Sequence, residues 1–310
     1  MKIYIHQGEG HSFSIEDIKN LEDSFPSVTF TTSLAEAKDA EVALATLFFF
    51  TKDNLLKLNN LKFIQTLSAG YDVIDLDYLK KHGIRLANLR DAYSIAIAED
   101  VVSKILFFNK NTRQYVTNMA NHVWNREKEI HDIYHKNVLI LGAGSIGKEI
   151  AKRLKSFDTS ITGYDVVQHQ VEFFDNIITT KEELEKAYSL ADYVIVSLPL
   201  NKTTFHMINA NVFDKMRSSA LLINIARGPI IDEDALYKAL KDKKIRGAAI
   251  DVVSEEPLIK TSKLWDLSNI YITPHVAFNG EYIKDKLMEI VKTNISNYLN
   301  NKPLINEIKL

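Results

Sequence analysis

The stretch "NVLILGAGSIGKEIAKRL", residues 137–154, decides the fold of this chain. It joins a short apolar run to an amphipathic helix through a loop with G-x-G-x-x-G spacing, and the three glycines are Gly142, Gly144 and Gly147. In such a loop the first glycine permits a tight turn, the second lets a pyrophosphate approach the backbone, and the third lets helix and strand pack closely. The amides of Ser145 and Ile146 would face the phosphates at the positive end of the helix. The stretch therefore predicts a dinucleotide site.

An acid at the end of the next apolar run supports this interpretation. The run "SITGYD" ends at Asp165, whose carboxylate would accept hydrogen bonds from the adenosine ribose hydroxyls and repel a 2′-phosphate. No Arg or Lys follows within "VVQHQ", residues 166–170. The sequence thus predicts NAD as the cofactor and disfavours NADP, and the alternative for Asp165 is an ordinary turn carboxylate.

Short β-type runs alternate along the chain with longer segments of helical periodicity, which is typical of parallel sheets covered by helices on both faces. We predict an α/β fold with two Rossmann-like or flavodoxin-like domains. The predicted strands form two sets, at residues 2–5, 28–32, 41–46, 62–68 and 84–88, and at residues 137–142, 160–165, 193–199, 220–226, 247–253 and 270–273. Residues 92–121 contain no Gly or Pro and predict helix, so the first boundary falls there. The predicted substrate domain comprises residues 1–99 and 280–310, and the NAD-binding domain, residues 100–279, is inserted into it.

Composition restricts the partners. A net charge of -2 from 38 basic and 40 acidic residues lacks the basic excess of nucleic-acid-binding proteins. The chain has no cysteine, which excludes disulfides and thiolate metal sites, and no metal site is predicted. The longest apolar runs fall short of the roughly 20 residues of a membrane-spanning helix, and the N-terminus lacks the apolar region of a secretory signal. We expect a cytoplasmic protein that binds a small molecule.

Ionisable side chains follow three predicted strands of the second set: Arg227 after residues 220–226, Asp251 and then Glu256 near the end of the next strand, and His275 after the last one. Ligands of open α/β sheets bind beyond the carboxyl ends of the strands. Each residue also has a structural explanation: an ion pair worth at most about 1 kcal/mol for Arg227, a solvated acid for Glu256, packing for His275. Together, downstream of a dinucleotide loop, they predict a cation, a carboxylate and an imidazole over the nicotinamide.

Several motifs, in this order, are similar to those of the D-isomer-specific 2-hydroxyacid dehydrogenase family over nearly the whole chain. They are "SAGYDVIDLDYLKKHGIRLAN" (68–88), "LGAGSIG" (141–147), "LPLNKTTFHMIN" (198–209), "INIARGPIIDEDAL" (223–236), "AAIDVVSEEPL" (248–258) and "WDLSNIYITPHVA" (265–277). The resemblance implies that Arg227, Glu256 and His275 are catalytic. It also implies further contacts, with Asp251 near the nicotinamide, with Pro199, Thr204 and Ala226 along the cofactor, and with the turn Ser68, Ala69, Gly70 and Tyr71 lending amides to the substrate carboxylate. Members of the family usually dimerise through their cofactor domains, so a homodimer is expected.

The resemblance and the chemistry of these residues predict hydride transfer between nicotinamide and C2 of a 2-oxo or D-2-hydroxy acid. Arg227 would hold the substrate with its planar guanidinium, and His275 would donate the proton during reduction and remove it during oxidation. Glu256 would hold the other ring nitrogen and favour the charged imidazole. The alternative is a non-catalytic NAD(H)-sensing scaffold of the same fold. A short-chain reductase would need a Tyr-x-x-x-Lys pair, and we interpret the one at Tyr237 and Lys241 as part of a structural helix.

Overall fold

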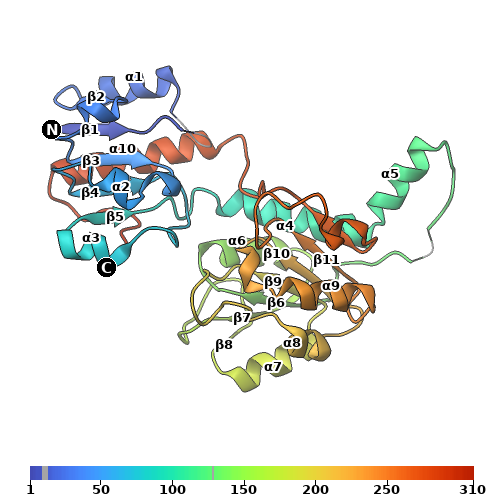
Figure 1. Cartoon of the computed structure of the whole chain (residues 1–310). Coiled ribbons are helices and arrows are strands. Elements are labelled where there is room, and N and C mark those ends of the chain that lie inside the picture. Colours follow the sequence, from blue (N-terminus) through green and yellow to red (C-terminus); the bar gives the residue numbers. More distant parts are fainter. Residues whose placement is uncertain (9–12, 128) are drawn as a thin grey trace. The chain divides into compact units, whose positions relative to one another are not determined.

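The computed structural model describes residues 1–8, 13–127 and 129–310, which divide into two compact units (Figure 1). Unit 1 combines Met1–Tyr93 with Gly280–Leu310, and unit 2 consists of Ser94–Asn279. The division placed from sequence after residue 99 lies within α4 (Ser94–Asn109), the helix with which unit 2 begins. Each unit contains its own parallel sheet.

The sheet of unit 1 has five parallel strands in the order β2-β1-β3-β4-β5. Their bounds are β1 (Lys2–Ile5), β2 (Thr29–Thr31), β3 (Val42–Ala45), β4 (Phe63–Thr66) and β5 (Arg85–Ala87). This is the strand order of flavodoxin-like doubly wound sheets, so the predicted fold class is confirmed for this unit. The inner strands β3 and β4 are buried along their whole length, because helices cover both faces of such a sheet.

The helices of unit 1 come from both parts of the chain. They are α1 (Ile15–Ser24), α2 (Lys52–Leu55), α3 (Leu76–His82) and α10 (Ile283–Leu299), with short 3-10 helices η1 (Leu34–Glu36) and η2 (Leu47–Phe49). Helix α1 begins after Ser14, which forms a capping box with Asp17. Helix α10 packs beside α1, where Lys284 lies 3.1 Å from the Asp17 carboxylate.

Buried polar contacts attach the C-terminal segment to the sheet of unit 1. The fully buried Asn294 of α10 donates to Gln65 on β4 at 2.7 Å, and its side-chain oxygen accepts the Ile305 amide at 2.7 Å. Beyond α10, the amide of Ile308 donates to the Leu86 carbonyl on β5 at 2.8 Å. Buried polar groups need hydrogen-bond partners, and here the C-terminal segment and the sheet provide them for each other. Residues 280–310 therefore complete the domain that starts at residue 1.

The sheet of unit 2 has seven parallel strands in the order β12-β11-β10-β9-β6-β7-β8. Their bounds are β6 (Asn137–Leu141), β7 (Ser160–Tyr164), β8 (Asn176–Ile178), β9 (Tyr193–Val196), β10 (Leu221–Asn224), β11 (Gly247–Ile250) and β12 (Ile270–Ile272). Counted from β6, this is the 3-2-1-4-5-6 order of dinucleotide-binding sheets with one further edge strand. The strand order reverses between β6 and β9, where ligands bind in such sheets.

Helices flank this second sheet. They are α4, α5 (Thr112–Ala120), α6 (Ser145–Lys155), α7 (Lys181–Leu190), α8 (Ala210–Lys215) and α9 (Glu233–Lys241), with η3 (Gly228–Ile230) and η4 (Lys263–Asp266). The predicted helical segment at residues 92–121 is divided into α4 and α5 at Asn111, whose φ is +50°. Helix α4 packs on α6, β10 and β11 and is buried along much of its length.

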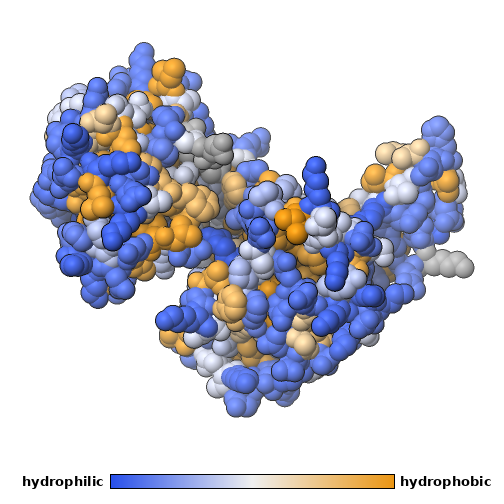
Figure 2. All heavy atoms as spheres, in the orientation of Figure 1, coloured by the Kyte–Doolittle hydropathy of each residue, from blue (hydrophilic) through white to orange (hydrophobic). Residues whose placement is uncertain are grey.

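Large apolar side chains are exposed on α5 and the segment after it: Val116 (54%), Met119 (72%), Val123 (50%) and Trp124 (98%). Figure 2 shows apolar surface on α5, which stands out from the rest of unit 2. Within the three described ranges, no helix combines the length and the apolar character that crossing a membrane requires.

Candidate active site

Two glycines of the loop after β6 are required by the protein itself. Gly142 has φ +104°, and its amide donates to the Tyr164 carbonyl at 2.8 Å. A Cβ at Gly147 would lie 2.1 Å from the Gly142 carbonyl oxygen, well inside the closest contact that a real side chain makes. The first and third glycines of the motif therefore set the turn and the close packing of α6 against it, in agreement with their predicted roles.

Gly144, the second glycine, differs from the other two. Its φ of -73° suits any residue, and an added Cβ would meet no atom of the described chain within 4 Å. Gly144 is also the N-cap of α6 and offers no side chain to the first helix amides, those of Ser145 and Ile146. Open space beside a positive helix end fits a pyrophosphate, so the loop suits the phosphates of a dinucleotide.

Asp165 lies directly after β7 and is half-buried. One carboxylate oxygen accepts the Ala143 amide of the glycine loop at 3.1 Å, and the other accepts the Val166 amide at 2.7 Å. These bonds fix the carboxylate beside the glycine loop. That position is compatible with both interpretations of Asp165, as a carboxylate that binds the ribose hydroxyls and as an ordinary turn carboxylate. The residues that follow, Val166 and Val167, are 79% and 61% exposed and carry no cation for a 2′-phosphate.

Three predicted cofactor-binding residues, Pro199, Thr204 and Ala226, form hydrogen bonds within their own loops. The buried Thr204 hydroxyl donates to the Pro199 carbonyl at 2.7 Å and accepts the Asn201 amide at 2.8 Å, which closes the turn after β9. Ala226 is 8% exposed, and its amide donates to the Asn224 side chain at 3.1 Å. In the structure these side chains shape the loops at the carboxyl edge of the sheet.

Arg227 follows β10 and is held by its neighbours. Its guanidinium donates to the Ala226 carbonyl at 2.8 Å, and the amide of the fully buried Asn224 donates to the Arg227 carbonyl at 3.0 Å. Sequence reasoning missed Asn224, although a polar residue within the apolar run "ALLINIA" is a signal for such a role. At the next position, a Cβ on Gly228 would lie 1.9 Å from the Val253 carbonyl carbon. The loop after β11, which carries Glu256, therefore crosses directly over the loop that carries Arg227.

The structure brings His275 and Glu256 together. Nδ1 of His275 lies 2.8 Å from Oε2 of Glu256, and each side chain is 39% exposed. The other carboxylate oxygen accepts the Val253 amide at 3.3 Å. Burial alone would raise the pKa of Glu256, but the hydrogen bond and charge of His275, with smaller effects of Val253 and Arg227, hold it below its ordinary value. An ionised carboxylate thus orients the imidazole through Nδ1, and Nε2 is the ring nitrogen that this contact does not use.

His275 has a left-handed backbone conformation, with φ +53°. Asp251, which is 2% exposed, accepts several hydrogen bonds from this turn. Its backbone carbonyl accepts the His275 amide at 2.7 Å. Its carboxylate accepts the Thr273 hydroxyl at 2.6 Å, the Val276 amide at 3.0 Å and the Ala277 amide at 2.9 Å. Strained conformations persist only where the surroundings over-determine them. Asp251 is therefore the residue that fixes the His275 loop, a role that its position in the sequence did not reveal.

The predicted substrate turn lies in unit 1, directly after β4. The Ser68 hydroxyl donates to the Gly70 carbonyl at 2.9 Å, and the Asn88 side chain donates to the Ala69 carbonyl at 2.6 Å. These bonds orient the peptide groups of the turn, and Tyr71 packs against the core of unit 1. The binding of a carboxylate by its amides stays a prediction.

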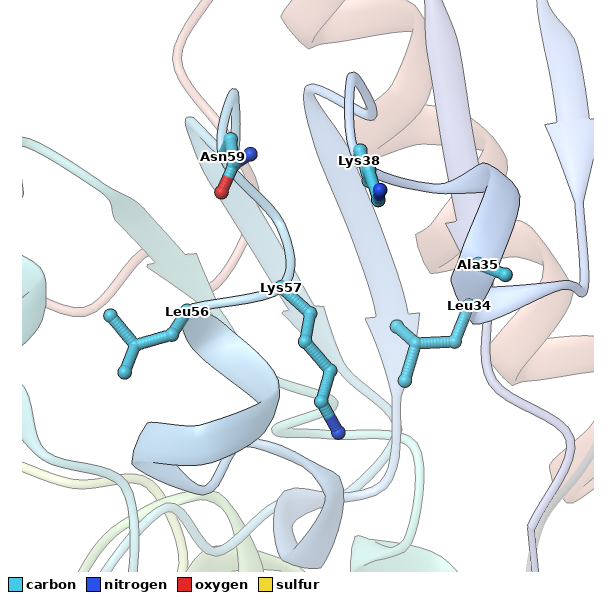
Figure 3. Close-up of a pocket in the computed structure, with 6 residues that line it drawn as sticks. All are labelled: Leu34, Ala35, Lys38, Leu56, Lys57 and Asn59. Carbon is cyan, nitrogen blue, oxygen red and sulfur yellow. The ribbon is translucent and has the colours of Figure 1, made fainter.

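A surface hollow in unit 1 is lined by Leu34, Ala35, Lys38, Leu56, Lys57 and Asn59. Figure 3 shows Leu34 and Lys57 extending into the space between η1 and the turn after α2. None of its lining residues is a predicted site residue, and the hollow plays no part in the chemistry described above.

Unit 2 is, by its strand order and glycine loop, a dinucleotide-binding domain whose carboxyl edge carries a histidine–carboxylate pair and an arginine. The chain belongs to the D-isomer specific 2-hydroxyacid dehydrogenase family: the model of that family's NAD binding domain matches residues 102–277.

Individual relatives agree with this membership. A glycerate dehydrogenase of Methylorubrum extorquens is 32% identical over 85% of this chain and 84% of its own. A D-3-phosphoglycerate dehydrogenase of Methanocaldococcus jannaschii is 31% identical over 89% of this chain, which spans only 55% of that relative's length. Among solved structures, a D-lactate dehydrogenase of Treponema pallidum is 25% identical, with a TM-score of 0.80 and full coverage of both chains.

Proposed function

We propose that the chain is an NAD(H)-dependent oxidoreductase that interconverts a 2-oxo acid and a D-2-hydroxy acid. The observation that carries the proposal is the 2.8 Å pair of His275 and Glu256, which lies on the same sheet as the dinucleotide loop. An imidazole oriented by an ionised carboxylate is suited to move one proton to or from a substrate oxygen. Family membership supports the same class of reaction.

Each residue has a distinct part in the proposed reaction. Bound NADH supplies the hydride. His275 donates a proton from Nε2 to the substrate carbonyl oxygen during reduction and recovers it from the hydroxyl during oxidation. Glu256 holds Nδ1 and orients the ring, and Arg227 holds the substrate carboxylate and carbonyl oxygens with its planar guanidinium. The turn at residues 68–71 would bind the carboxylate with its amides, which makes unit 1 the substrate domain.

We also propose NAD(H) in preference to NADP(H). The support is the carboxylate of Asp165 fixed beside the glycine loop, followed by the exposed apolar residues Val166 and Val167. A 2′-phosphate would meet a negative charge there and gain no cation from these residues. Comparable kcat/KM values with NADPH and NADH would remove this part of the proposal.

A homodimer through the cofactor domain is part of the proposal. The exposed apolar side chains of Val116, Met119, Val123 and Trp124 lie together on α5 and the following segment of unit 2. Burying apolar surface of this kind stabilises association. The cytoplasmic location stays a prediction from composition, to be checked by fractionation.

The decisive experiment is a panel of 2-oxo acids with NADH, followed at the nicotinamide absorbance. Pyruvate, hydroxypyruvate, its 3-phosphate and glyoxylate are the first candidates, because relatives of the chain are named D-lactate, glycerate and D-3-phosphoglycerate dehydrogenase and glyoxylate reductase. His275→Gln is the matched control, since it should abolish turnover and leave NADH binding intact. If wild-type protein binds NADH but oxidises it with no member of the panel, the enzyme proposal fails and the NAD(H)-sensing scaffold takes its place.

A further inference from the structure

Helix α4 carries a lysine that is buried and has no part in the proposed reaction. The Lys104 side chain is 0% exposed, and its ammonium donates to Asp100, one turn earlier on the same helix. The same nitrogen lies 4.0 Å from Oδ1 of Asp251, whose side chain is 1% exposed. The ring of Tyr271 on β12 has its centroid 5.9 Å from this nitrogen. Because a buried ammonium is costly, its position facing Asp251 needs a reason.

The carboxylate of Asp251 holds the loop that carries His275 by accepting hydrogen bonds from it. Three donors point at its carboxylate, from the Thr273 hydroxyl and from the amides of Val276 and Ala277. The ammonium of Lys104 lies 4.0 Å from the same carboxylate, and both side chains are buried, so the two groups form a buried pair beneath the loop.

We propose that Lys104 is a positioning residue for His275, acting through Asp251. Its ammonium holds the Asp251 carboxylate in the place where it accepts from Thr273, Val276 and Ala277. These bonds in turn hold the left-handed turn at His275 and the ring against Glu256. The inference rests on the proposed function, because it assigns the geometry of the proton donor to a residue outside the site. The charged and titratable groups around Asp251 are Lys104 and Asp100 of α4, Tyr271 of β12 and His275 of its own loop.

The test compares two neutral variants with one control. Lys104→Met removes the charge. Lys104→Gln also removes the charge but keeps a hydrogen-bond donor for Asp100, and this second variant decides the question if Lys104→Met does not fold. Asp100→Asn is the control, because it also removes a half-buried charge next to Lys104 but leaves the lysine beside Asp251. The readouts are kcat and KM for reduction, NADH affinity, and amide hydrogen exchange of the peptide that spans residues 273–278.

We expect both lysine variants to lower kcat by about 10- to 100-fold, as small misplacements of a reacting group do, with NADH affinity unchanged and faster exchange at Val276 and Ala277. Asp100→Asn should match wild type in both kcat and exchange. Wild-type kcat and exchange in Lys104→Gln would overturn the proposal, and so would an equal loss in Asp100→Asn, which would indicate general packing of α4. If wild-type protein reduces no 2-oxo acid, the proposed function fails, and the exchange measurement still decides the role of Lys104.

Discussion

The contrast between Gly144 and Gly147 gives a sharp prediction, because the two glycines share one motif and differ in what surrounds them. In Gly144→Ala the new Cβ meets no described atom within 4 Å, and the backbone already has an ordinary φ of -73°. Restricting the unfolded chain would stabilise by about 0.4–1 kcal/mol, and losing a glycine N-cap would cost a similar amount. The free energy of unfolding should therefore change little.

The same methyl group occupies the space in which we place the pyrophosphate. We expect Gly144→Ala to bind NADH about 10- to 100-fold more weakly, which corresponds to about 1.4–2.7 kcal/mol of binding free energy. In Gly147→Ala the Cβ would lie 2.1 Å from the Gly142 carbonyl oxygen, so the backbone of the turn must move. Overpacking of this kind costs about 1–3 kcal/mol, and this variant should lose both stability and NADH affinity.

Thermal unfolding by circular dichroism and titration of NADH fluorescence separate the two effects. A melting temperature near wild type with weakened NADH binding is the result expected for Gly144→Ala alone. Wild-type NADH affinity in that variant would refute the placement of the pyrophosphate at Gly144. Wild-type stability in Gly147→Ala would refute the close packing of α6 against the turn.

Three further predictions concern proton transfer, stability and assembly. Glu256→Gln should lower kcat for reduction, because the His275 ring loses the carboxylate that holds its Nδ1; steady-state kinetics would show it, and a wild-type kcat would contradict the pairing. The pKa of Glu307 is lowered chiefly by the hydrogen bond from Arg85. This bond therefore stabilises unit 1 at pH values above the ordinary pKa of a glutamate, and its contribution is lost as the pH falls through the lowered pKa of Glu307. Arg85→Ala should therefore lower the urea midpoint at pH 7 and lose this effect below about pH 4.5; an equal deficit at acid pH would contradict it. Met119→Lys should break the proposed dimer and give a monomer in light scattering without loss of helix content, and a dimer that persists in this variant would exclude α5 from the interface.

Much of the fold followed from the order of the residues. Short β-type runs of four to seven residues between helical segments predicted two parallel sheets, since strands covered on both faces have that pattern, and the structure contains both sheets. The spacing of Gly142, Gly144 and Gly147 placed the cofactor loop at the end of β6. The break of the long helical segment at Asn111 was not predicted, because no Gly or Pro marks it.

The sequence by itself determined the fold class, the dinucleotide loop and the residue types at the strand ends, because periodicity and glycine spacing are local properties of the chain. It also suggested Glu256 as a partner for His275 without showing how two residues 19 positions apart come to lie 2.8 Å from each other. Only the tertiary structure decided that contact, the burial of Asp251 beneath the His275 turn and the approach of Lys104 from α4. These depend on where separate strands and helices meet, and burial and hydrogen bonding between distant segments leave no regular spacing in the sequence.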